Sequence, residues 1–325
     1  MSEIINWGVI GIGKVCELKS VPAYQKTHGF CVKAVMGRDI LKAESFAKRH
    51  QIELFFDDVH AMIHHPEIDA IYIATPPDSH LFYAQLVADA GKICCVEKPM
   101  AVNYEESTKM NALFVAKNIP LFVSYYRRSL PRFEQVKKWL DAAAIGTIRQ
   151  VTWQLSKTSN PITDVKGAVN WRTDKNSAPG GYFDDLASHG LNLFQHLFGD
   201  IVAVKGIAIN QQGNYTAKDA VSATWKHRNE VLGSGTWNFG AWKREDKVEI
   251  IGAKGKISFS MFNEEALKLE TLDGVKEVFI DNPENIQLFH TQNMQKQLSN
   301  KNFKHPSTGD SALKTAWIME TILAD

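Results

Sequence analysis

The chain has 325 residues, more than one hydrophobic core usually organises, so we expect two domains. Its 37 Lys and Arg residues nearly balance its 36 Asp and Glu residues, and a net charge of +1 gives no electrostatic reason to expect nucleic acid or a membrane as partner. We therefore expect a small-molecule ligand.

The first residues and the cysteines are typical of a cytoplasmic protein. The start, MSEIINWGVIGIG, lacks the basic region, long apolar stretch and cleavage site of a secretory signal, and no later segment is long and apolar enough to span a bilayer. The 4 cysteines have neither metal-site nor disulfide-framework spacing, so we expect them to be reduced and buried: Cys16, Cys31, Cys94 and Cys95.

Short apolar runs alternate with amphipathic segments from Ile4 to Ser124. Strands this apolar are covered on both faces, so the alternation predicts a parallel sheet wrapped by helices. Residues 1–124 are thus predicted to form a doubly wound Rossmann domain of the α/β class. We expect its strands at INWGVIG, FCVKAVM, ELFF, IDAIYIA, ICCVE and PLFVSY, and helices through Leu18, from Asp39 to His50, around Met62, from Asp78 to Gly91 and around Met110.

After about Ser129 the strands follow one another and alternate residue by residue. Val151, Trp153 and Leu155 share one face of such a strand, and Val221, Ala223 and Trp225 repeat the pattern. A helix is expected from Tyr182 to Phe198, after a polar loop from Lys157 to Pro179 of a kind that is commonly functional or disordered. Residues 125–325 are thus predicted to form an α+β domain with an open, mostly antiparallel sheet.

The sequence GVIGIGKVC at 8–16 lies between an apolar strand and a helix, the context that a dinucleotide-binding turn requires. Gly11 and Gly13 allow a tight turn and a close approach of backbone N–H groups to a pyrophosphate. The third position of the fingerprint is Cys16 instead of glycine, and a small residue still satisfies helix–strand packing there. The alternative is a glycine-rich turn without a ligand.

The second strand is followed by Gly37 and Arg38, where an NAD-selective protein usually carries an acidic residue that binds the ribose 2′-hydroxyl. A guanidinium suits a 2′-phosphate, so we expect NADP(H) to be preferred, with NAD as the alternative cofactor. Asp39 is interpreted as the N-cap of the next helix. The alternative for Arg38 is a solvated surface side chain.

Hydride transfer from a carbinol carbon requires a group that accepts the hydroxyl proton. Lys98 follows the strand ICCVE at the sheet edge where doubly wound folds bind ligands, and Asp185 and His189 lie four residues apart on one face of the expected helix. A carboxylate one turn from an imidazole can orient it and favour its protonated form. Taken alone, Lys98 also fits an ordinary surface lysine. Asp185 and His189 taken alone also fit a helix-capping Asp and a half-buried His.

Six motifs in order resemble the glucose-fructose oxidoreductase and inositol dehydrogenase (Gfo/Idh/MocA) family over nearly the whole chain. They are GVIGIG, ATPPDSH at 74–80, EKP at 97–99, YYRRSLP at 125–131, NWR at 170–172 and GGYFDDLASH at 180–189. The resemblance implies that Lys98, Asp185 and His189 are catalytic and that Tyr126 and Arg127 face the substrate together with Asp185 and His189. It also implies a set of cofactor-binding residues: Gly11, Ile12, Gly13, Lys14, Val15, Arg38, Thr75, Pro76, His80, Glu97, Lys98, Trp171 and Arg172.

By the same resemblance, the open sheet of the second domain forms the interface of a homodimer or homotetramer. We interpret its aromatic stripe, which includes Trp153, Trp225 and Trp237, as part of that interface, because a large exposed apolar patch is costly in a monomer. The C-terminal helix ends at ILAD, without the extension of many relatives.

Three functions are compatible with these residues, and the leading one is an NADP(H)-dependent oxidoreductase acting on a secondary hydroxyl or ketone of a sugar or polyol. The alternatives are a redox-assisted glycoside-cleaving enzyme and a non-catalytic regulator that senses the cofactor. No metal is expected. His60 and His64 have chelating spacing, but no general-base Glu lies between them, and the segment is interpreted as a surface helix and loop.

Overall fold

The computed structural model describes residues 4–167 and 170–324, and the chain divides into two compact units. The first unit comprises Met1–Ser129 and Pro283–Leu313, and the second comprises Leu130–Asn282 and Lys314–Asp325. Residues 168 and 169, within the predicted loop from Lys157 to Pro179, lie outside the described residues.

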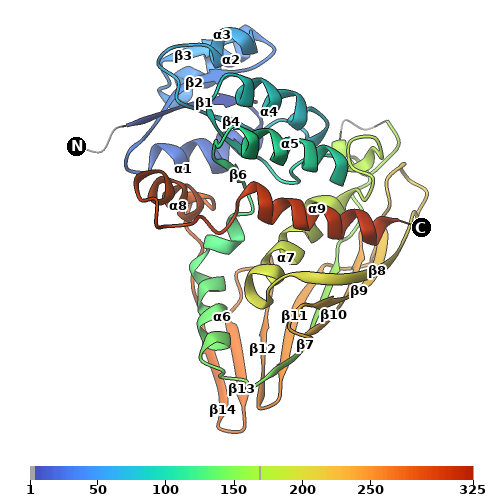
Figure 1. The fold of residues 1–325 in the computed structure, drawn as a ribbon. Coiled ribbons are helices and arrows are strands. Elements are labelled where there is room, and N and C mark those ends of the chain that lie inside the picture. Colours follow the sequence, from blue (N-terminus) through green and yellow to red (C-terminus); the bar gives the residue numbers. More distant parts are fainter. Residues whose placement is uncertain (1–3, 168–169, 325) are drawn as a thin grey trace. The chain divides into compact units, whose positions relative to one another are not determined.

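The first unit is built on a parallel sheet with strand order β3-β2-β1-β4-β5-β6, the order of a dinucleotide-binding Rossmann fold, with helices on both faces (Figure 1). Its strands are β1 (Ile5–Ile10), β2 (Phe30–Met36), β3 (Leu54–Phe56), β4 (Ala70–Ile73), β5 (Ile93–Val96) and β6 (Leu121–Val123). Its helical segments are η1 (Cys16–Ser20), α1 (Val21–Gln25), α2 (Ile40–His50), α3 (Val59–Ile63), η2 (Pro77–Ser79), α4 (His80–Asp89), α5 (Tyr104–Ala116), η3 (Tyr126–Ser129) and α8 (Leu288–Ser299).

Strand β4 shows why these apolar runs form a sheet that is covered on both sides. All of its side chains are buried, and alternate residues belong to different cores. Ile71 and Ile73 pack with Met110 on one face, whereas Ala70 and Tyr72 pack with Trp7 on the other. The predicted Rossmann domain is therefore confirmed.

The observed division differs from the predicted boundaries of 1–124 and 125–325, because the segment 283–313 returns to the first unit. Buried hydrogen bonds hold it there: Gln287 Nε2 donates to Glu97 Oε1 at 2.7 Å, and the hydroxyls of Thr27 and Thr291 are 2.7 Å apart. Near its end, the Ser307 hydroxyl donates to the carbonyl oxygen of Val123 at 2.6 Å. Such pairings join residues far apart in the sequence, so no local pattern predicts them.

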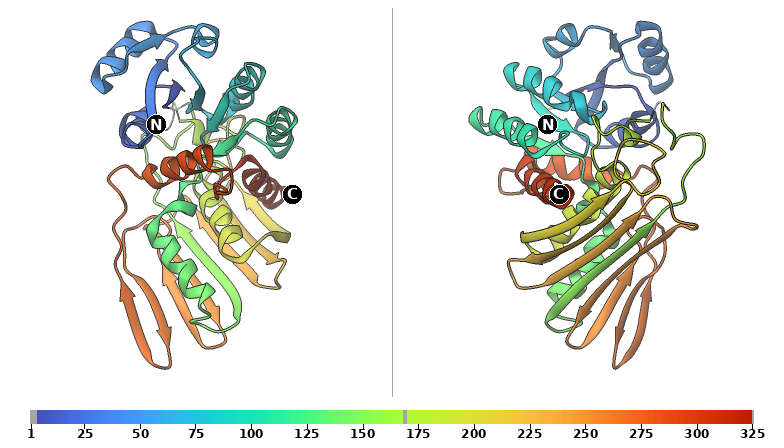
Figure 2. Two further views of the ribbon diagram at one scale, coloured as in Figure 1. Left: turned by 60° about the vertical axis from the view of Figure 1, so that its left-hand side comes forward. Right: turned by 90° about the vertical axis from the view of Figure 1, so that its right-hand side faces the viewer.

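The second unit contains a sheet with strand order β14-β13-β12-β11-β7-β10-β9-β8, in which β7 and β10 are parallel and the other neighbouring pairs antiparallel. Helices cover one face, and the right-hand view of Figure 2 shows the other, uncovered face. The strands are β7 (Ile148–Ser156), β8 (Ile201–Ile209), β9 (Ala220–His227), β10 (Leu232–Asn238), β11 (Glu245–Gly252), β12 (Gly255–Phe259), β13 (Leu267–Thr271) and β14 (Gly274–Val278). The helical segments are α6 (Pro131–Asp141), η4 (Trp171–Thr173), α7 (Tyr182–Phe198) and α9 (Gly309–Leu323), which begins in the first unit.

The interpretation of the aromatic stripe as an exposed interface is wrong. Trp153, Trp225 and Trp237 are only 1%, 3% and 1% exposed, because they pack against α7. Phe194 of that helix stacks on Trp225 at 5.9 Å between ring centroids, and Phe183 meets Trp237 edge-on at 5.0 Å. The stripe is therefore part of the core of this unit.

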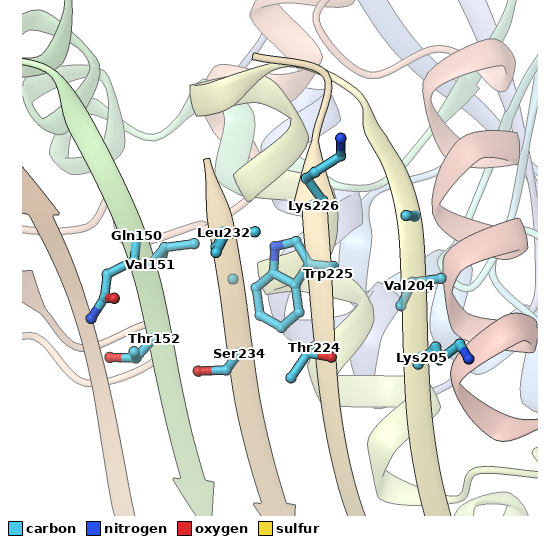
Figure 3. A pocket seen from close by; sticks show the side chains of 12 residues that line it. Gln150, Val151, Thr152, Val204, Lys205, Thr224, Trp225, Lys226, Leu232 and Ser234 are labelled. Atoms are coloured by element: carbon cyan, nitrogen blue, oxygen red, sulfur yellow. The ribbon is translucent and has the colours of Figure 1, made fainter. Parts of the chain in front are cut away.

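Small polar side chains occupy the uncovered face instead. Thr152, Ser234 and Thr224 are register partners and form a row across β7, β10 and β9 (Figure 3). Two apolar side chains are also exposed there, Leu232 of β10 at 57% and Ile207 of β8 at 73%. Alternation along a strand shows that two faces exist, but it does not show which of them a helix covers.

Within residues 4–324, apart from 168 and 169, no helix has the length and apolar character that crossing a membrane requires.

Candidate functional site

The glycine-rich turn follows β1 at the point where the strand order reverses, between β1 and β4. Gly11 has φ +102°, and a Cβ there would lie 2.9 Å from the carbonyl oxygen of Ala74, so only glycine fits without strain. At Gly13, in contrast, no described atom beyond the neighbouring residues of the chain lies within 4 Å of an added Cβ. The turn thus presents an open stretch of backbone at the sheet edge where such folds bind ligands.

The residues after the turn begin a helical segment. The amide of Glu17 donates to the carbonyl oxygen of Gly13 at 3.0 Å, and Lys14 and Val15 are exposed at the start of this segment. Cys16 is fully buried and packs in the same core as Trp7 and Tyr24. A thiol at the third fingerprint position therefore contributes to packing between the helical segment and the sheet.

The end of β2 supplies the predicted cofactor-selecting residues. The carboxylate of Asp39 accepts hydrogen bonds from the amides of Leu41 and Lys42 at 3.1 and 3.2 Å, and the Lys42 bond is the main cause that lowers the pKa of Asp39. This confirms that Asp39 is the N-cap of α2. Arg38 is exposed and takes part in none of the hydrogen bonds or ion pairs found in the described part of the chain.

A cavity of about 510 Å³ lies beside Asp39 and the glycine-rich turn. It is lined by Ile12, Asp39, Leu41, Lys42, Ser45, Phe46 and Arg49. Apolar side chains and cations therefore surround a space next to the turn.

His80 joins two of the predicted cofactor loops. Its Nε2 lies 2.8 Å from the carbonyl oxygen of Thr75, and its Nδ1 lies 3.1 Å from that of Pro99. Burial lowers its pKa, although these carbonyls and Glu97 act in the opposite direction. The imidazole, which is fully buried, thus contacts the protein's own backbone, while Pro76 in the loop that it supports is exposed.

Glu97 is similarly engaged within the first unit. Its carboxylate accepts hydrogen bonds from the Tyr72 hydroxyl at 2.6 Å, from Gln287 at 2.7 Å and from the amide of Lys98 at 3.2 Å. These contacts fix the backbone from which the half-buried Lys98 side chain extends. Sequence reasoning missed Gln287, because nothing local to it signals a contact with the EKP motif.

Tyr126 and Arg127, the predicted substrate residues, lie on η3 in the first unit. Both are buried, and the Arg127 guanidinium carbon lies 5.0 Å from the centroid of the Tyr126 ring. This distance permits a cation–π contact.

Asp185 and His189 lie one turn apart on α7 in the second unit, and both are buried. The Nε of Arg172 donates to Asp185 Oδ2 at 2.6 Å, and the Arg172 guanidinium carbon lies 4.4 Å from the Trp171 ring centroid. The structure therefore brings together the NWR and D-x-x-x-H motifs. A carboxylate that is bound to a guanidinium and lies one helical turn from an imidazole can orient a proton-transfer group.

Asp184 is a second acid that sequence reasoning passed over, although it stands beside Asp185 in the printed motif. Its carboxylate accepts a hydrogen bond from the amide of Gly180 at 2.7 Å. Burial, with a smaller contribution from Asp185, raises the pKa of Asp184 to about 7. Asp184, at the start of α7, is therefore protonated more readily than an exposed aspartate.

The histidines at 60–65 have ordinary surroundings. His60 lies exposed on α3, and His65 Nδ1 accepts a hydrogen bond from the amide of Glu67 at 3.3 Å. This confirms the interpretation of a surface helix and loop. Across residues 4–167 and 170–324, no group of three or more His, Cys, Asp or Glu side chains is arranged to hold a metal ion.

Comparison with known proteins identifies the family of the chain. Residues 5–125 match the family model described as "Oxidoreductase family, NAD-binding Rossmann fold", and residues 133–258 match the GFO/IDH/MocA C-terminal domain. Oxidoreductase P35 of Formosa agariphila is 37% identical over 287 residues, which cover 88% of each chain. The chain belongs to the GFO/IDH/MocA family. It is therefore an oxidoreductase with an NAD-binding Rossmann domain.

More distant family members have named substrates. A trans-1,2-dihydrobenzene-1,2-diol dehydrogenase of Bos taurus is 26% identical over 256 residues, covering 77% of this chain and 72% of that protein. The solved structure of a levoglucosan dehydrogenase in complex with NADH and levoglucosan superposes with a TM-score of 0.87 at 24% identity, covering 98% of this chain and 96% of that one. At that identity the structural match supports the fold alone.

Proposed function

We propose that the protein is an NADP(H)-dependent oxidoreductase that transfers a hydride to or from a secondary hydroxyl or ketone of a sugar, a polyol or a related small molecule. The observation that supports this most is the ion pair between the half-buried Arg172 and the buried Asp185, one turn from His189, in a chain whose other unit carries an open dinucleotide-binding turn. The named substrates of its relatives carry hydroxyl groups, which supports the substrate class.

The residues of the first unit fit a dinucleotide. The uncovered backbone at Gly13, at the start of a helical segment, suits a pyrophosphate, and the neighbouring cavity suits an adenosine. Arg38, exposed after β2, would bind a 2′-phosphate with its planar donors. When bound, the cofactor supplies or accepts the hydride at C4 of its nicotinamide.

The protein's own residues would handle the proton. Lys98 or His189 accepts the hydroxyl proton in the oxidative direction and returns it in the reductive direction, and Asp185 orients the imidazole. Tyr126 and Arg127 contribute to substrate binding.

A carbohydrate panel with NADPH and NADP⁺ tests the proposal, with absorbance at 340 nm as the readout. For a substrate that turns over, Lys98→Met is expected to lower kcat by roughly 10²- to 10⁴-fold, the usual contribution of a positioned proton donor. Lys92→Met serves as a matched lysine control on the same unit. Sugar release without net change in NADPH would instead indicate redox-assisted glycoside cleavage, and cofactor binding without turnover on any substrate would indicate a regulator.

The cofactor preference has its own test. Arg38→Ala is expected to weaken NADPH binding by about tenfold or more while leaving NADH binding unchanged, since a lost charged hydrogen bond is worth about 1.5–3 kcal/mol. Fluorescence titration of the reduced cofactors measures both affinities. Equal affinities for NADPH in wild type and Arg38→Ala would contradict the role of Arg38.

We also propose that the uncovered sheet face of the second unit forms a homodimer or homotetramer. The small side chains Thr152, Ser234 and Thr224 line a pocket of about 480 Å³ in this face (Figure 3), which side chains of another sheet could fill, and Leu232 and Ile207 are exposed on it. Light scattering should show an oligomer for the wild type and a smaller species for Ser234→Arg, with Lys268→Arg near the sheet edge as control.

A further inference from the structure

The loop after β7 contains a buried carboxylate that the proposed reaction does not use. The side chain of Asp164 is 0% exposed. Its Oδ1 accepts hydrogen bonds from the hydroxyls of Tyr182 and Thr163 at 2.6 and 3.0 Å, and its Oδ2 accepts from the amide of Asn160 at 2.8 Å and from Lys157 Nζ at 3.1 Å. Burial by itself raises the pKa of Asp164, but these donors outweigh it and lower the pKa below its ordinary value. Asp164 is therefore a buried anion around which the loop is organised.

Tyr182, the first residue of α7, connects this anion to the next turn of the chain. Its hydroxyl donates to Asp164 and accepts a hydrogen bond from Asn170 Nδ2 at 3.2 Å. Lys157 Nζ lies 4.2 Å from the centroid of its ring. Burial, and then the Asp164 hydrogen bond, raise the pKa of Tyr182, so the hydroxyl keeps its proton for donation.

Asn170 in turn holds the residues that reach Asp185. Its Oδ1 accepts a hydrogen bond from the amide of Arg172 at 3.2 Å, which makes it the N-cap of η4. Gly181 packs against this turn, since a Cβ there would lie 2.8 Å from the carbonyl oxygen of Arg172. The Arg172 guanidinium then donates to Asp185. One set of hydrogen bonds therefore runs from Asp164 to Asp185 within the second unit.

We propose that Asp164 is a positioning residue, which acts through the Tyr182 hydroxyl and the Asn170 side chain to keep Arg172 on Asp185. The proposal rests on the proposed function only in taking Asp185 as part of the reacting site. Burial of a carboxylate is unfavourable in free energy unless hydrogen bonds satisfy every lone pair, and a loop that only connects two elements does not need a buried carboxylate. Here the carboxylate of Asp164 sets the geometry of an arginine that contacts a predicted catalytic acid.

The variant Tyr182→Phe removes the connecting hydroxyl and keeps the ring. We expect kcat to fall about tenfold with the substrate KM within about twofold, because an interaction that orients a reacting group contributes to the transition state. Tyr215→Phe is the matched control: this hydroxyl is also buried, and it has no hydrogen-bond partner in the described part of the chain. Equal kcat values for the two variants would overturn the proposal.

A double-mutant cycle separates positioning from a general loss of structure. If Tyr182 acts through Arg172, Tyr182→Phe should cost less than about twofold in kcat in an Arg172→Ala background, since the contact that it supports is already gone. The same tenfold loss in both backgrounds would show that the hydroxyl acts elsewhere.

Limited proteolysis provides a readout that needs no reaction. Trypsin should cleave after Lys166 and Arg172 several-fold faster in Tyr182→Phe than in Tyr215→Phe, because the loop opens more readily. An unchanged cleavage rate in Tyr182→Phe would overturn the positioning role, whatever the kinetic measurements show. Failure of the wild type to turn over any carbohydrate would instead contradict the proposed function, and the cleavage comparison would still test the loop.

Discussion

Glycines have different roles in the two units. In the first unit Gly13 leaves the backbone uncovered, with no described atom near an added Cβ. In the second unit Gly190, Gly233 and Gly235 make room for tryptophans, because an added Cβ would lie 2.0–2.3 Å from the rings of Trp153, Trp225 and Trp237. The glycine with a proposed ligand role stands in a recognisable local motif, whereas a glycine that allows packing depends on a partner distant in sequence.

Among the variants that compare the two units, Gly13→Val has the largest expected effect, and it tests the proposed ligand role in the first unit. The new side chain would point into open space, so the free energy of unfolding should change by less than ~0.5 kcal/mol. Cofactor binding should weaken roughly a hundredfold or more, because the side chain occupies the space in which a pyrophosphate approaches the backbone. Fluorescence titration with NADPH and chemical denaturation measure the two quantities. A variant that binds NADPH like the wild type would show that this turn is structural.

The second effect concerns the segment 283–313, whose packing on the first unit the sequence does not predict. His290 and His305 are buried there with ring centroids 4.6 Å apart. Burial lowers the pKa of His305 from its ordinary 6.5 to about 4, and it lowers the pKa of His290 in the same direction. Both rings are therefore neutral in the folded protein at pH 7.

Below pH 6.5 the unfolded chain binds protons that the folded chain does not, so stability is full above pH 6.5 and falls as the pH drops toward 4. For His305 alone the interval corresponds to about 3 kcal/mol, at ~1.36 kcal/mol per pH unit. Urea denaturation at pH 7.5, 6 and 5 should show this loss in the wild type and in His60→Asn, and a smaller loss in His305→Asn. Parallel curves for the two variants would exclude His305 as the source.

Gly190→Ala tests the packing role in the second unit. The added methyl group would lie 2.2 Å from the Trp153 ring, which is buried between Phe194 and Trp237 and cannot move aside cheaply. We expect a loss of roughly 1–3 kcal/mol in stability, as for other overpacked cores, with NADPH affinity unchanged. Trp153→Phe should relieve the clash, so the double variant should be more stable than the sum of the single effects predicts. Additive effects would mean that α7 moves away from β7 with no loss of stability.

Some of the features that these variants test are predictable from the sequence, and others are not. The parallel strands and the Asp39 cap were predictable, because each depends on neighbours in the sequence. The D-x-x-x-H spacing likewise placed Asp185 and His189 on one helix face, and the structure has them one turn apart on α7. Family resemblance supplied Arg172, but its contact with Asp185 depends on how the intervening loop folds.

What the sequence could not predict depends on tertiary structure. The tryptophan stripe was assigned to the wrong face because a strand pattern does not specify where α7 packs. The sequence does not single out Asp164, because a lone Asp in a polar loop usually faces solvent. It becomes a buried anion through four hydrogen-bond donors, which lie up to 18 residues away in the sequence. Gln287 and the histidines of the segment 283–313 were missed for the same reason.

The smallest expected effect is that of Asp39→Ala, which separates two hypotheses for the residue after Arg38. Asp39 is either the N-cap of α2 or a ligand of the cofactor ribose. As the N-cap of α2 this carboxylate accepts hydrogen bonds from Leu41 and Lys42, so its removal should cost about 1 kcal/mol of stability. Asp39→Asn, which keeps an accepting oxygen, should cost much less. If Asp39 serves only the helix, NADH affinity will be the same in both variants and in the wild type. Weaker NADH binding in Asp39→Ala, out of proportion to the loss of stability, would make Asp39 a ribose ligand and remove the reason to expect that Arg38 selects NADP(H).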